Sequence, residues 1–274
     1  MSTTIRMIEL TRGRKVAVAE MGQGRPVLYL HGFADIHGAS VDWLPFHEEL
    51  ARSVRIIAPA HPGCAASDEN EDIDNINDVA FHYLEVLDAL GLDRVDIVGH
   101  CFGGWVAAEL ATRNPDRVNS LVLLAASGLF VAGEPIGDLF WEAQAQNGNE
   151  YPGLRSLLFA DGHSSQALAL LPDGRMDVDR EVSRYKVMRY ASRVGFKPPY
   201  FYNRNLRERL HRVRARTLIV AGDSDRMVPR AHADAYSKGI AGSQLSIVKN
   251  AGHALHIDAA AQSAGLVREF LAGS

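Results

Sequence analysis

The chain has 274 residues, of which 47% are hydrophobic and 23% are charged, and its formal net charge is -4. This composition is typical of a globular protein, and no basic patch or long charge run indicates nucleic-acid binding or a disordered tail. Residues 1–20 lack the apolar core of a signal peptide, and no apolar run has the length of a membrane helix. Two cysteines cannot build a disulfide framework. We therefore expect a cytoplasmic protein without nucleic-acid or membrane partners.

Short apolar segments alternate with helical patterns along most of the chain. Residues 77–90 and 101–113 predict helices, which Gly91 and the Asn114-Pro115 pair should end. Several of the apolar segments have no polar face, as expected for parallel strands covered on both sides. The alternation predicts an α/β protein with a mostly parallel central sheet and helices on both faces. The expected strands lie within residues 15–22, 25–32, 54–61, 94–100, 118–126, 216–223 and 244–252.

One long segment interrupts this alternation. Residues 128–212 contain no convincing strand but several short helical patterns, of which residues 177–192 form the clearest. A crossover between two strands needs far fewer residues. We therefore expect residues 1–127 and 213–274 to form the core and residues 128–212 to form an inserted helical cap. Ligands of open α/β sheets bind outside the carboxyl ends of the strands, so the cap should cover the site.

The stretch around Cys101 has the spacing of a nucleophile elbow. Gly99 and Gly103 stand two residues before and after Cys101, between a predicted strand and a predicted helix. This is the pattern Gly-x-nucleophile-x-Gly, with cysteine in place of serine. The N-terminus of a helix also favours a thiolate. We interpret Cys101 as a nucleophile; the alternatives are a redox sensor that uses Cys64 as its partner, and a small buried side chain in a turn whose glycines only allow close packing.

A cysteine nucleophile needs a base and an acid that orients the base. His253 follows the last predicted strand, which places it on the same rim of the sheet as Cys101. Asp223 and Asp225 follow the strand before it. The order nucleophile, acid, histidine along the chain is the order found with this type of elbow.

Two backbone donors are needed for the oxyanion that forms during acyl transfer. The N–H group of Phe102, directly after the nucleophile, is one candidate. The N–H group of Phe33 is the other, because Phe33 follows His31-Gly32 at the end of an early predicted strand.

These stretches together resemble the α/β-hydrolase-fold enzymes of the lidded esterase type. The resemblance covers the chain from residue 25 to the C-terminal helix. It implies an α/β-hydrolase fold with a helical cap, Asp225 rather than Asp223 as the acid, and His253 as the base. The family usually carries serine where this chain has Cys101. The supporting motifs are HGF at 31–33, RIIAPAHPG at 55–63, GHCFGGW at 99–105, NPDRVNSLVLL at 114–124, GDSDRMVP at 222–229 and NAGH at 250–253.

The predicted function is that of a hydrolase which forms a covalent acyl-enzyme on Cys101. Thiolates attack acyl carbons well but also leave readily, which favours small hydrophobic activated esters, lactones or thioesters as substrates. A thioester intermediate can also pass its acyl group to an acceptor other than water, so an acyltransferase is an alternative. A carbon–carbon bond hydrolase of the meta-cleavage type is a second enzyme alternative. A ligand-binding or signalling protein on a hydrolase scaffold is the non-enzyme alternative.

The cap should determine the substrate, and we expect Phe140 and Trp141 to contact it together with His31. The sequence has no metal-ligand spacing, phosphate-binding loop or dinucleotide fingerprint. We therefore expect neither a metal nor another cofactor, and a monomer or homodimer that acts on a small molecule.

Overall fold

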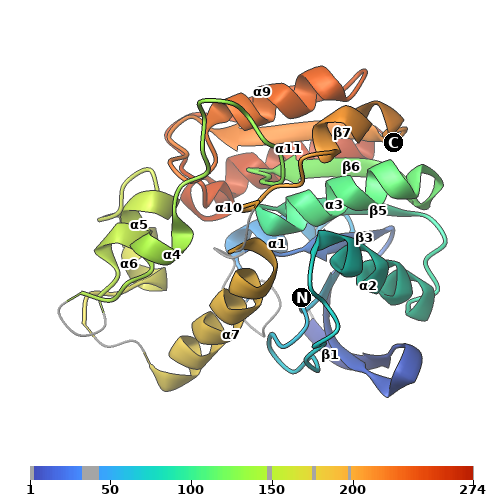
Figure 1. Ribbon diagram of the computed structural model, residues 1–274, viewed down its shortest axis with the longest axis horizontal. Coiled ribbons are helices and arrows are strands. Elements are labelled where there is room, and N and C mark those ends of the chain that lie inside the picture. Colours follow the sequence, from blue (N-terminus) through green and yellow to red (C-terminus); the bar gives the residue numbers. More distant parts are fainter. Residues whose placement is uncertain (1–2, 33–42, 147–149, 175–176, 197–198, 274) are drawn as a thin grey trace.

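The computed structural model describes residues 3–32, 43–146, 150–174, 177–196 and 199–273. Within these residues, eight strands form one sheet in the order β1-β2-β4-β3-β5-β6-β7-β8 (Figure 1). The pairs β1/β2 and β2/β4 are antiparallel, and the pairs from β4/β3 to β7/β8 are parallel. The predicted mostly parallel sheet is therefore confirmed. The strands are β1 (Thr3–Glu9), β2 (Lys15–Met21), β3 (Pro26–Leu30), β4 (Arg55–Pro59), β5 (Val95–His100), β6 (Val118–Leu124), β7 (Arg216–Gly222) and β8 (Gln244–Val248).

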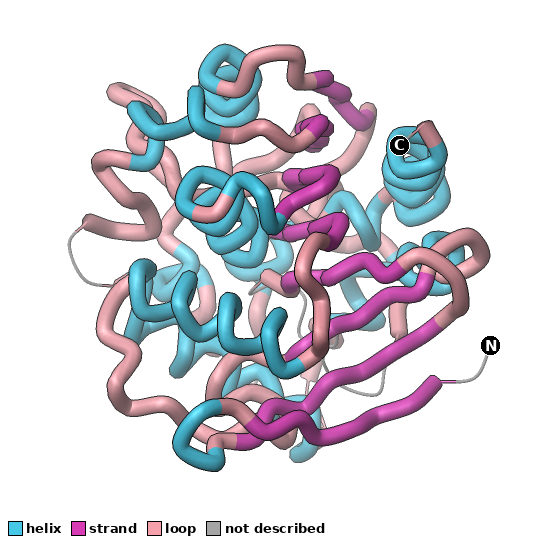
Figure 2. The backbone as a smooth tube through the Cα atoms, turned by 90° about the vertical axis from the view of Figure 1, so that its right-hand side faces the viewer, coloured by secondary structure: helices cyan, strands magenta, loops and turns pink. Residues whose placement is uncertain are grey.

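Helices cover both faces of this sheet, as predicted. Successive residues of a strand point to opposite faces, so Leu28 and Leu30 of β3 pack into one core while Val27 and Tyr29 pack into the other. Figure 2 shows the C-terminal helix on the opposite side of the strands from the helices at the left of the view. The first core holds α2 (Ile76–Ala89), α3 (Phe102–Arg113) and α9 (Arg230–Gly239), and the second holds α1 (Pro45–Leu50), α10 (Leu255–Asp258) and α11 (Ala260–Ala272).

The helix that precedes the elbow begins and ends where its sequence indicates. The Asn75 side chain accepts a hydrogen bond from the Asn77 N–H at 2.8 Å, and the Asp78 carboxylate accepts one from the Asn75 N–H at 3.1 Å. This reciprocal cap fixes the first turn of α2. Gly91, which follows the C-terminal end of the helix, has a φ of +66°, a value that favours glycine.

Strand β1 is absent from the sequence predictions. It lies at the edge of the sheet and pairs with β2 along its whole length, from Thr3 opposite Met21 to Glu9 opposite Lys15. Only Ile8 of this strand is buried. An edge strand with so little burial does not need an apolar alternation, which is the signal that predicts strands.

Between β6 and β7 the described chain forms helices and no extended strand. Figure 1 shows α4 to α7 grouped on one side of the molecule, apart from α9 and α11. The two connections of this region to the core lie side by side, because the Gly128 N–H donates to the Phe201 carbonyl at 3.1 Å and the Asn203 N–H donates to the Gly128 carbonyl at 3.0 Å. The helices are α4 (Leu139–Glu142), α5 (Pro152–Leu158), α6 (Ser165–Leu170), α7 (Val178–Gly195) and α8 (Leu206–Arg209); the short 3₁₀ turns of the chain are η1 (Thr11–Gly13), η2 (Pro115–Arg117) and η3 (Leu210–Arg212).

Candidate active site

Cys101 occupies a tight turn between β5 and α3. Its φ of 53° and ψ of −114° lie outside the regions that side chains usually adopt. Glycines on both sides make this turn sterically feasible. A Cβ atom on Gly99 would collide with the backbone of Gly103, and one on Gly103 would collide with the carbonyl group of Leu30. The turn therefore has the geometry of the elbow that its glycine spacing suggests.

The elbow is held by the strands on either side of β5. The Cys101 N–H donates to the carbonyl of Leu124 at the end of β6 at 2.9 Å, and the Cys101 carbonyl accepts from the Ser127 N–H at 3.2 Å. On the other side, a Cβ atom on Gly32 would lie only 2.6 Å from the Cys101 Cβ. The turn that follows β3 thus lies directly against Cys101, which is fully buried.

His253 and Asp225 form a buried pair beside this elbow. The Nδ1 atom of His253 lies 3.0 Å from Oδ2 of Asp225, and both side chains are at most 1% exposed. The other carboxylate oxygen accepts hydrogen bonds from the N–H groups of Met227 and Val228 at 2.9 and 2.8 Å. Because Nδ1 donates to the carboxylate, Nε2 is the atom of the imidazole that can exchange a proton with a neighbour.

The charge state of His253 depends on its two neighbours. Burial alone lowers its pKa, but the Asp225 carboxylate and the Cys101 sulfur both raise it, and the resulting pKa is about 10. Both neighbours thus favour the charged form of the imidazole, and the effect of Cys101 requires that its sulfur lies close to the ring. The buried Nε2 atom of His253 makes no hydrogen bond within the described residues.

Asp223 lies outside this group. Its exposed carboxylate accepts a hydrogen bond from the Asn250 N–H at 2.9 Å and lies 3.5 Å from the Lys249 ammonium. It links the loops that follow β7 and β8. The structure thus brings Asp225, and not Asp223, to the imidazole of His253.

The turn that follows β3 contains a histidine, His31, whose two ring nitrogens both have hydrogen-bond partners. Its Nε2 accepts the His61 N–H at 3.1 Å, and its Nδ1 lies 3.1 Å from the Gly32 carbonyl oxygen. His31 thus lies in the wall of the site, and its predicted contact with substrate stays a prediction. Phe102 is the first residue of α3, where backbone N–H groups point out of the helix end. Phe33, the second predicted oxyanion donor, lies outside the described residues.

Comparison with known proteins identifies the family. A family model described as alpha/beta hydrolase fold matches residues 25–260. The chain belongs to the α/β-hydrolase fold family. It is 30% identical over 271 residues to the 2-hydroxymuconate semialdehyde hydrolase of Pseudomonas sp. strain CF600, an alignment that covers 96% of this chain and 92% of that protein.

Solved structures show the same fold at lower identity. The meta-cleavage product hydrolase CumD from Pseudomonas fluorescens IP01 is similar with a TM-score of 0.75 and 22% identity, over 98% of this chain and 97% of that one. The carboxylesterase CesB from Bacillus subtilis is similar with a TM-score of 0.77 and 20% identity, over 100% and 93%. The predicted α/β-hydrolase fold is therefore confirmed, and the protein is a hydrolase.

In this α/β-hydrolase, the helices inserted between β6 and β7 rest on the loops that carry His253 and Asp225. The Ala254 N–H donates to the Leu158 carbonyl at 2.8 Å, next to the candidate base. Arg226, next to the candidate acid, donates to the carbonyls of Ser156 and Phe159 at 2.7 and 2.9 Å. The C-terminal end of α5 is thus attached to both loops, which the sequence did not indicate.

The aromatic residues predicted to contact substrate occupy different surroundings. Phe140 packs among aromatic rings, with the Phe201 ring stacked on it at 5.8 Å and the Phe196 ring at 4.6 Å. Trp141 is 67% exposed on α4. Tyr190 of α7 stacks on His61, with the ring centroids 5.0 Å apart. The roles of Phe140 and Trp141 in substrate binding stay predictions.

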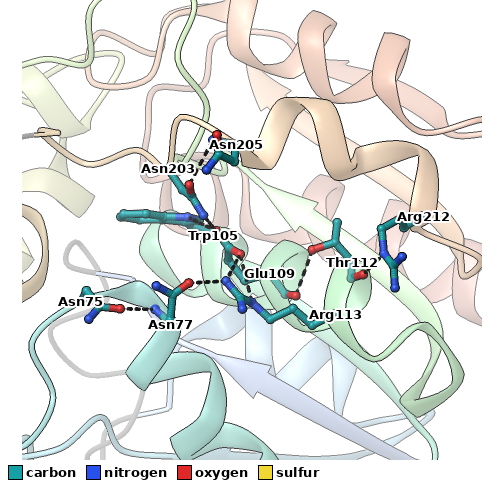
Figure 3. Close-up of polar contacts among 9 residues, drawn as sticks. All are labelled: Asn75, Asn77, Trp105, Glu109, Thr112, Arg113, Asn203, Asn205 and Arg212. Atoms are coloured by element: carbon teal, nitrogen blue, oxygen red, sulfur yellow. Dashed lines mark hydrogen bonds and ion pairs between the residues drawn. The ribbon is translucent and has the colours of Figure 1, made fainter.

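The two segments that connect the inserted helices to the core are attached to α3, the helix that begins at the elbow. Figure 3 shows the buried Glu109 carboxylate between three donors. It accepts hydrogen bonds from Trp105 Nε1 at 3.1 Å, Arg113 Nη2 at 3.0 Å and Asn203 Nδ2 at 2.7 Å. Trp105 also packs against Gly128, where a Cβ atom would collide with its ring. Both connections to the core therefore meet α3 at the same place.

Two kinds of feature are absent from the described part of the chain. No cluster of three or more histidine, cysteine, aspartate or glutamate side chains there could hold a metal ion. None of the helices described has both the length and the apolar surface needed to cross a membrane.

Proposed function

We propose that this hydrolase cleaves an activated acyl bond through a covalent intermediate on Cys101, with His253 as the acid–base group and Asp225 as the group that orients it. The observation that carries this proposal is the strained elbow at Cys101, with the buried His253–Asp225 pair beside it. An imidazole beside a sulfur can accept its proton and so give the thiolate, which is the nucleophilic form of cysteine.

The reaction follows from this arrangement. The thiolate attacks the carbonyl carbon, and the electron pair of the C=O bond moves onto its oxygen, which the backbone N–H of Phe102 stabilises. When the adduct collapses, the bond to the leaving group breaks and the His253 imidazolium supplies the proton that the leaving group takes up. Water then attacks the thioester while His253 accepts its proton, and the acid and the Cys101 thiolate are released. Asp225 keeps the imidazole in one orientation throughout.

We propose that the bond cleaved is a carbon–carbon bond next to a carbonyl group in a small conjugated enol acid. The support is the 30% identity, over nearly the whole of both chains, to an enzyme named for its action on 2-hydroxymuconate semialdehyde. In a compound of this class, the electron pair of the broken bond is delocalised into a conjugated carbonyl. Such a leaving group suits a thiolate adduct, which otherwise collapses back by losing the sulfur. In this proposal residues 128–212 form the cap that covers the substrate.

A second candidate is the hydrolysis of an activated ester, lactone or thioester. The observation that favours it is the sulfur itself, because good leaving groups compete best with the loss of a thiolate. The two candidates share the acyl-enzyme and differ in the atom that leaves.

The test compares both substrate classes on the same protein. Loss of the absorbance of 2-hydroxymuconate semialdehyde measures carbon–carbon cleavage, and a panel of aryl esters, lactones and acyl thioesters, each with and without an added alcohol, measures acyl transfer. Mass spectrometry of the quenched enzyme should show the acyl group on Cys101. Cys101→Ala should abolish turnover, whereas Cys64→Ala should retain it, because burial raises the pKa of Cys64 to about 12.

The outcomes separate the alternatives. Faster turnover of the enol acid than of every ester supports carbon–carbon cleavage, and the reverse supports the second candidate. Full activity of Cys101→Ala on all substrates would overturn the acyl-enzyme on Cys101.

A further inference from the structure

The core holds the loops of the candidate acid and base where they leave their strands. The Asp223 N–H donates to the Val248 carbonyl at 3.0 Å, and the Ser224 N–H donates to the Ala251 carbonyl at 3.0 Å. These bonds continue the pairing of β7 with β8. Both bonds precede the acid and the base along the chain, so they do not themselves fix the two side chains that follow.

The loop of the candidate base is attached to the inserted helices through Asp258. One carboxylate oxygen of this residue, Oδ2, accepts hydrogen bonds from the N–H groups of Gly252 and Ala160, both at 2.8 Å. Gly252 directly precedes His253, and Ala160 follows the end of α5. Asp258 is itself held at the end of α10, where its N–H donates to the Ala254 carbonyl at 2.9 Å. Because the acceptor is a carboxylate, the two bonds to Oδ2 are stronger than bonds between neutral groups.

The backbone on both sides of His253 lies directly against residues 158–160, at the end of α5. The Ala254 N–H donates to the Leu158 carbonyl at 2.8 Å. A Cβ atom on Gly252 would lie only 2.7 Å from the same carbonyl oxygen. The residue before the base and the residue after it therefore both contact this segment.

The loop of the candidate acid is attached to the same end of α5 by Arg226. This residue directly follows Asp225. Its guanidinium donates to the carbonyls of Ser156, Phe159 and Ala160 at 2.7, 2.9 and 3.2 Å. The last carbonyls of a helix have no partner within the helix, and a cation beside them is favourable. Arg226 therefore supplies both the donors and the charge that the end of α5 requires.

We propose that Asp258 and Arg226 are positioning residues, which fix the base and the acid to one shared segment, residues 158–160. The proposal rests on the acyl-enzyme function proposed above. Neither residue needs to touch the substrate. A shift of either loop would change the 3.0 Å distance between the imidazole and the carboxylate, and so the orientation of the imidazole. Small displacements of this kind can lower a reaction rate by large factors.

The experiment removes each attachment in the full-length protein. Asp258→Ala deletes the carboxylate, and Arg226→Met deletes the donors but keeps an apolar stem. We expect each variant to slow acylation of Cys101 by phenyl acetate, followed as the burst of phenol, about 10-fold, a factor typical of a lost hydrogen bond to a charged group. Asp258→Asn should stay within about 3-fold of wild type, because its amide oxygen can still accept both N–H groups.

The titration of His253 separates positioning from a general loss of stability. Burial lowers the pKa of His253, but the Asp225 carboxylate raises it, and the resulting pKa is about 10. An imidazole that moves away from this carboxylate loses its proton at lower pH. NMR titration should therefore show a lower pKa of His253 in Asp258→Ala and in Arg226→Met, whereas Asp258→Asn should titrate like wild type.

A double variant tests whether the two residues act through one segment. If they do, the loss of one attachment already frees the pair, and the second loss has little left to change. Asp258→Ala combined with Arg226→Met should then slow acylation by no more than about 20-fold, whereas independent contributions would multiply to about 100-fold. A multiplicative loss would overturn the shared segment.

Two variants serve as matched controls. Asp177 Oδ1 also accepts two backbone N–H groups, those of Asp179 and Arg180 at 2.8 and 3.2 Å, but at the start of α7. Arg212 also donates to a backbone carbonyl, that of Thr112 at 2.8 Å. Asp177→Ala and Arg212→Met should lose stability in urea unfolding, but both should keep the wild-type burst rate and the wild-type titration of the candidate base.

The outcomes separate this inference from the proposed function. An unchanged burst rate and an unchanged His253 titration in Asp258→Ala overturn the inference, as does an equal loss of rate in Asp177→Ala. If phenyl acetate does not acylate Cys101 in the wild-type protein, the proposed function is overturned. The titration needs no substrate, so it still decides whether Asp258 and Arg226 position the imidazole.

Discussion

His100 donates a hydrogen bond from its Nε2 to the main-chain carbonyl of His253 at 3.0 Å. The residue directly before the candidate nucleophile thus holds the loop of the candidate base. Strands β5 and β8 are not neighbours in the sheet, since β6 and β7 lie between them. The order of the strands alone therefore does not place Cys101 next to His253. The buried His100 side chain connects the two loops through its hydrogen bond to the His253 carbonyl.

We expect His100→Ala to slow acylation of Cys101 about 5-fold, because the loss of a neutral hydrogen bond worth about 1 kcal/mol frees the loop that carries the imidazole. His82→Ala is the control. His82 is also buried, but it lies on α2, and neither Asp225 nor His253 is among the groups that shift its pKa. Both variants should lose stability in urea unfolding, and only His100→Ala should lose rate. A similar rate for the two variants would contradict the positioning role of His100.

The acid can be identified by comparing two aspartates that lie two residues apart. Asp225→Asn should lower kcat by a factor on the order of 10³ to 10⁴, since an amide leaves the imidazole in the wrong tautomer. Asp223→Asn should stay within a few-fold of wild type, because its exposed carboxylate faces Lys249 and Asn250 rather than His253. Steady-state kinetics with one substrate measure both effects. A larger loss with Asp223→Asn than with Asp225→Asn at equal stability would assign the acid to Asp223.

The raised pKa of His253 predicts a pH dependence of stability. A histidine with a pKa of about 10 in the folded protein and about 6.5 in the unfolded chain binds its proton more tightly when folded. The stabilisation is therefore fully present below pH 6.5 and is lost as the pH rises toward 10. Asp225→Asn removes the main cause of the raised pKa, so NMR titration should show His253 losing its proton at lower pH than in wild type. Asp223→Asn should leave this titration unchanged.

The fold could be predicted from the sequence because the strands at the centre of the sheet are buried on both faces. The apolar runs at 94–100 and 118–126 contain β5 and β6, and the predicted helices at 77–90 and 101–113 match α2 and α3 to within one residue at each end. Strand β1 was missed because only Ile8 of it is buried. Its formation depends on backbone pairing with β2, which leaves no pattern in the side chains.

Those residues of the candidate site that come directly after a strand could be predicted from the sequence. Cys101, Asp225 and His253 all follow parallel strands, and such ends meet at one edge of a sheet. The contacts of His61 and His100 were not predictable, because they depend on the orientation of buried rings between elements distant in the sequence. The RIIAPAHPG stretch included His61 only at the end of a predicted strand. The preference for esters came from the sulfur at position 101, whereas the similarity to a semialdehyde hydrolase favours the carbon–carbon alternative.

Two glycines should respond in opposite ways to the same substitution. A Cβ atom on Gly32 would lie 2.6 Å from that of Cys101, so Gly32→Ala must displace the elbow or the turn against it. We expect Gly32→Ala to reduce acylation at least 100-fold and to lower the melting temperature. Gly265 lies inside α11 with no atom within 4 Å of such a Cβ. Gly265→Ala should raise the free energy of unfolding by about 0.5–1 kcal/mol and leave acylation unchanged. Normal acylation of Gly32→Ala would show that the turn can move without loss of function.

Asn203 attaches the inserted helices to α3. Asn203 Nδ2 donates to the buried Glu109 carboxylate at 2.7 Å, while Arg113 keeps the carboxylate paired. Asn203→Ala should therefore leave the ion pair intact and loosen only the segment that returns to the core. We expect KM for a large hydrophobic ester to rise about 5-fold, equivalent to about 1 kcal/mol for one lost hydrogen bond, while kcat for phenyl acetate stays unchanged. Asn205→Ala, an exposed neighbour whose N–H bonds to the Asn203 side chain, is the control and should change neither constant. If kcat for phenyl acetate fell with Asn203→Ala, the contact with Glu109 would instead support the elbow itself, because α3 begins at Cys101.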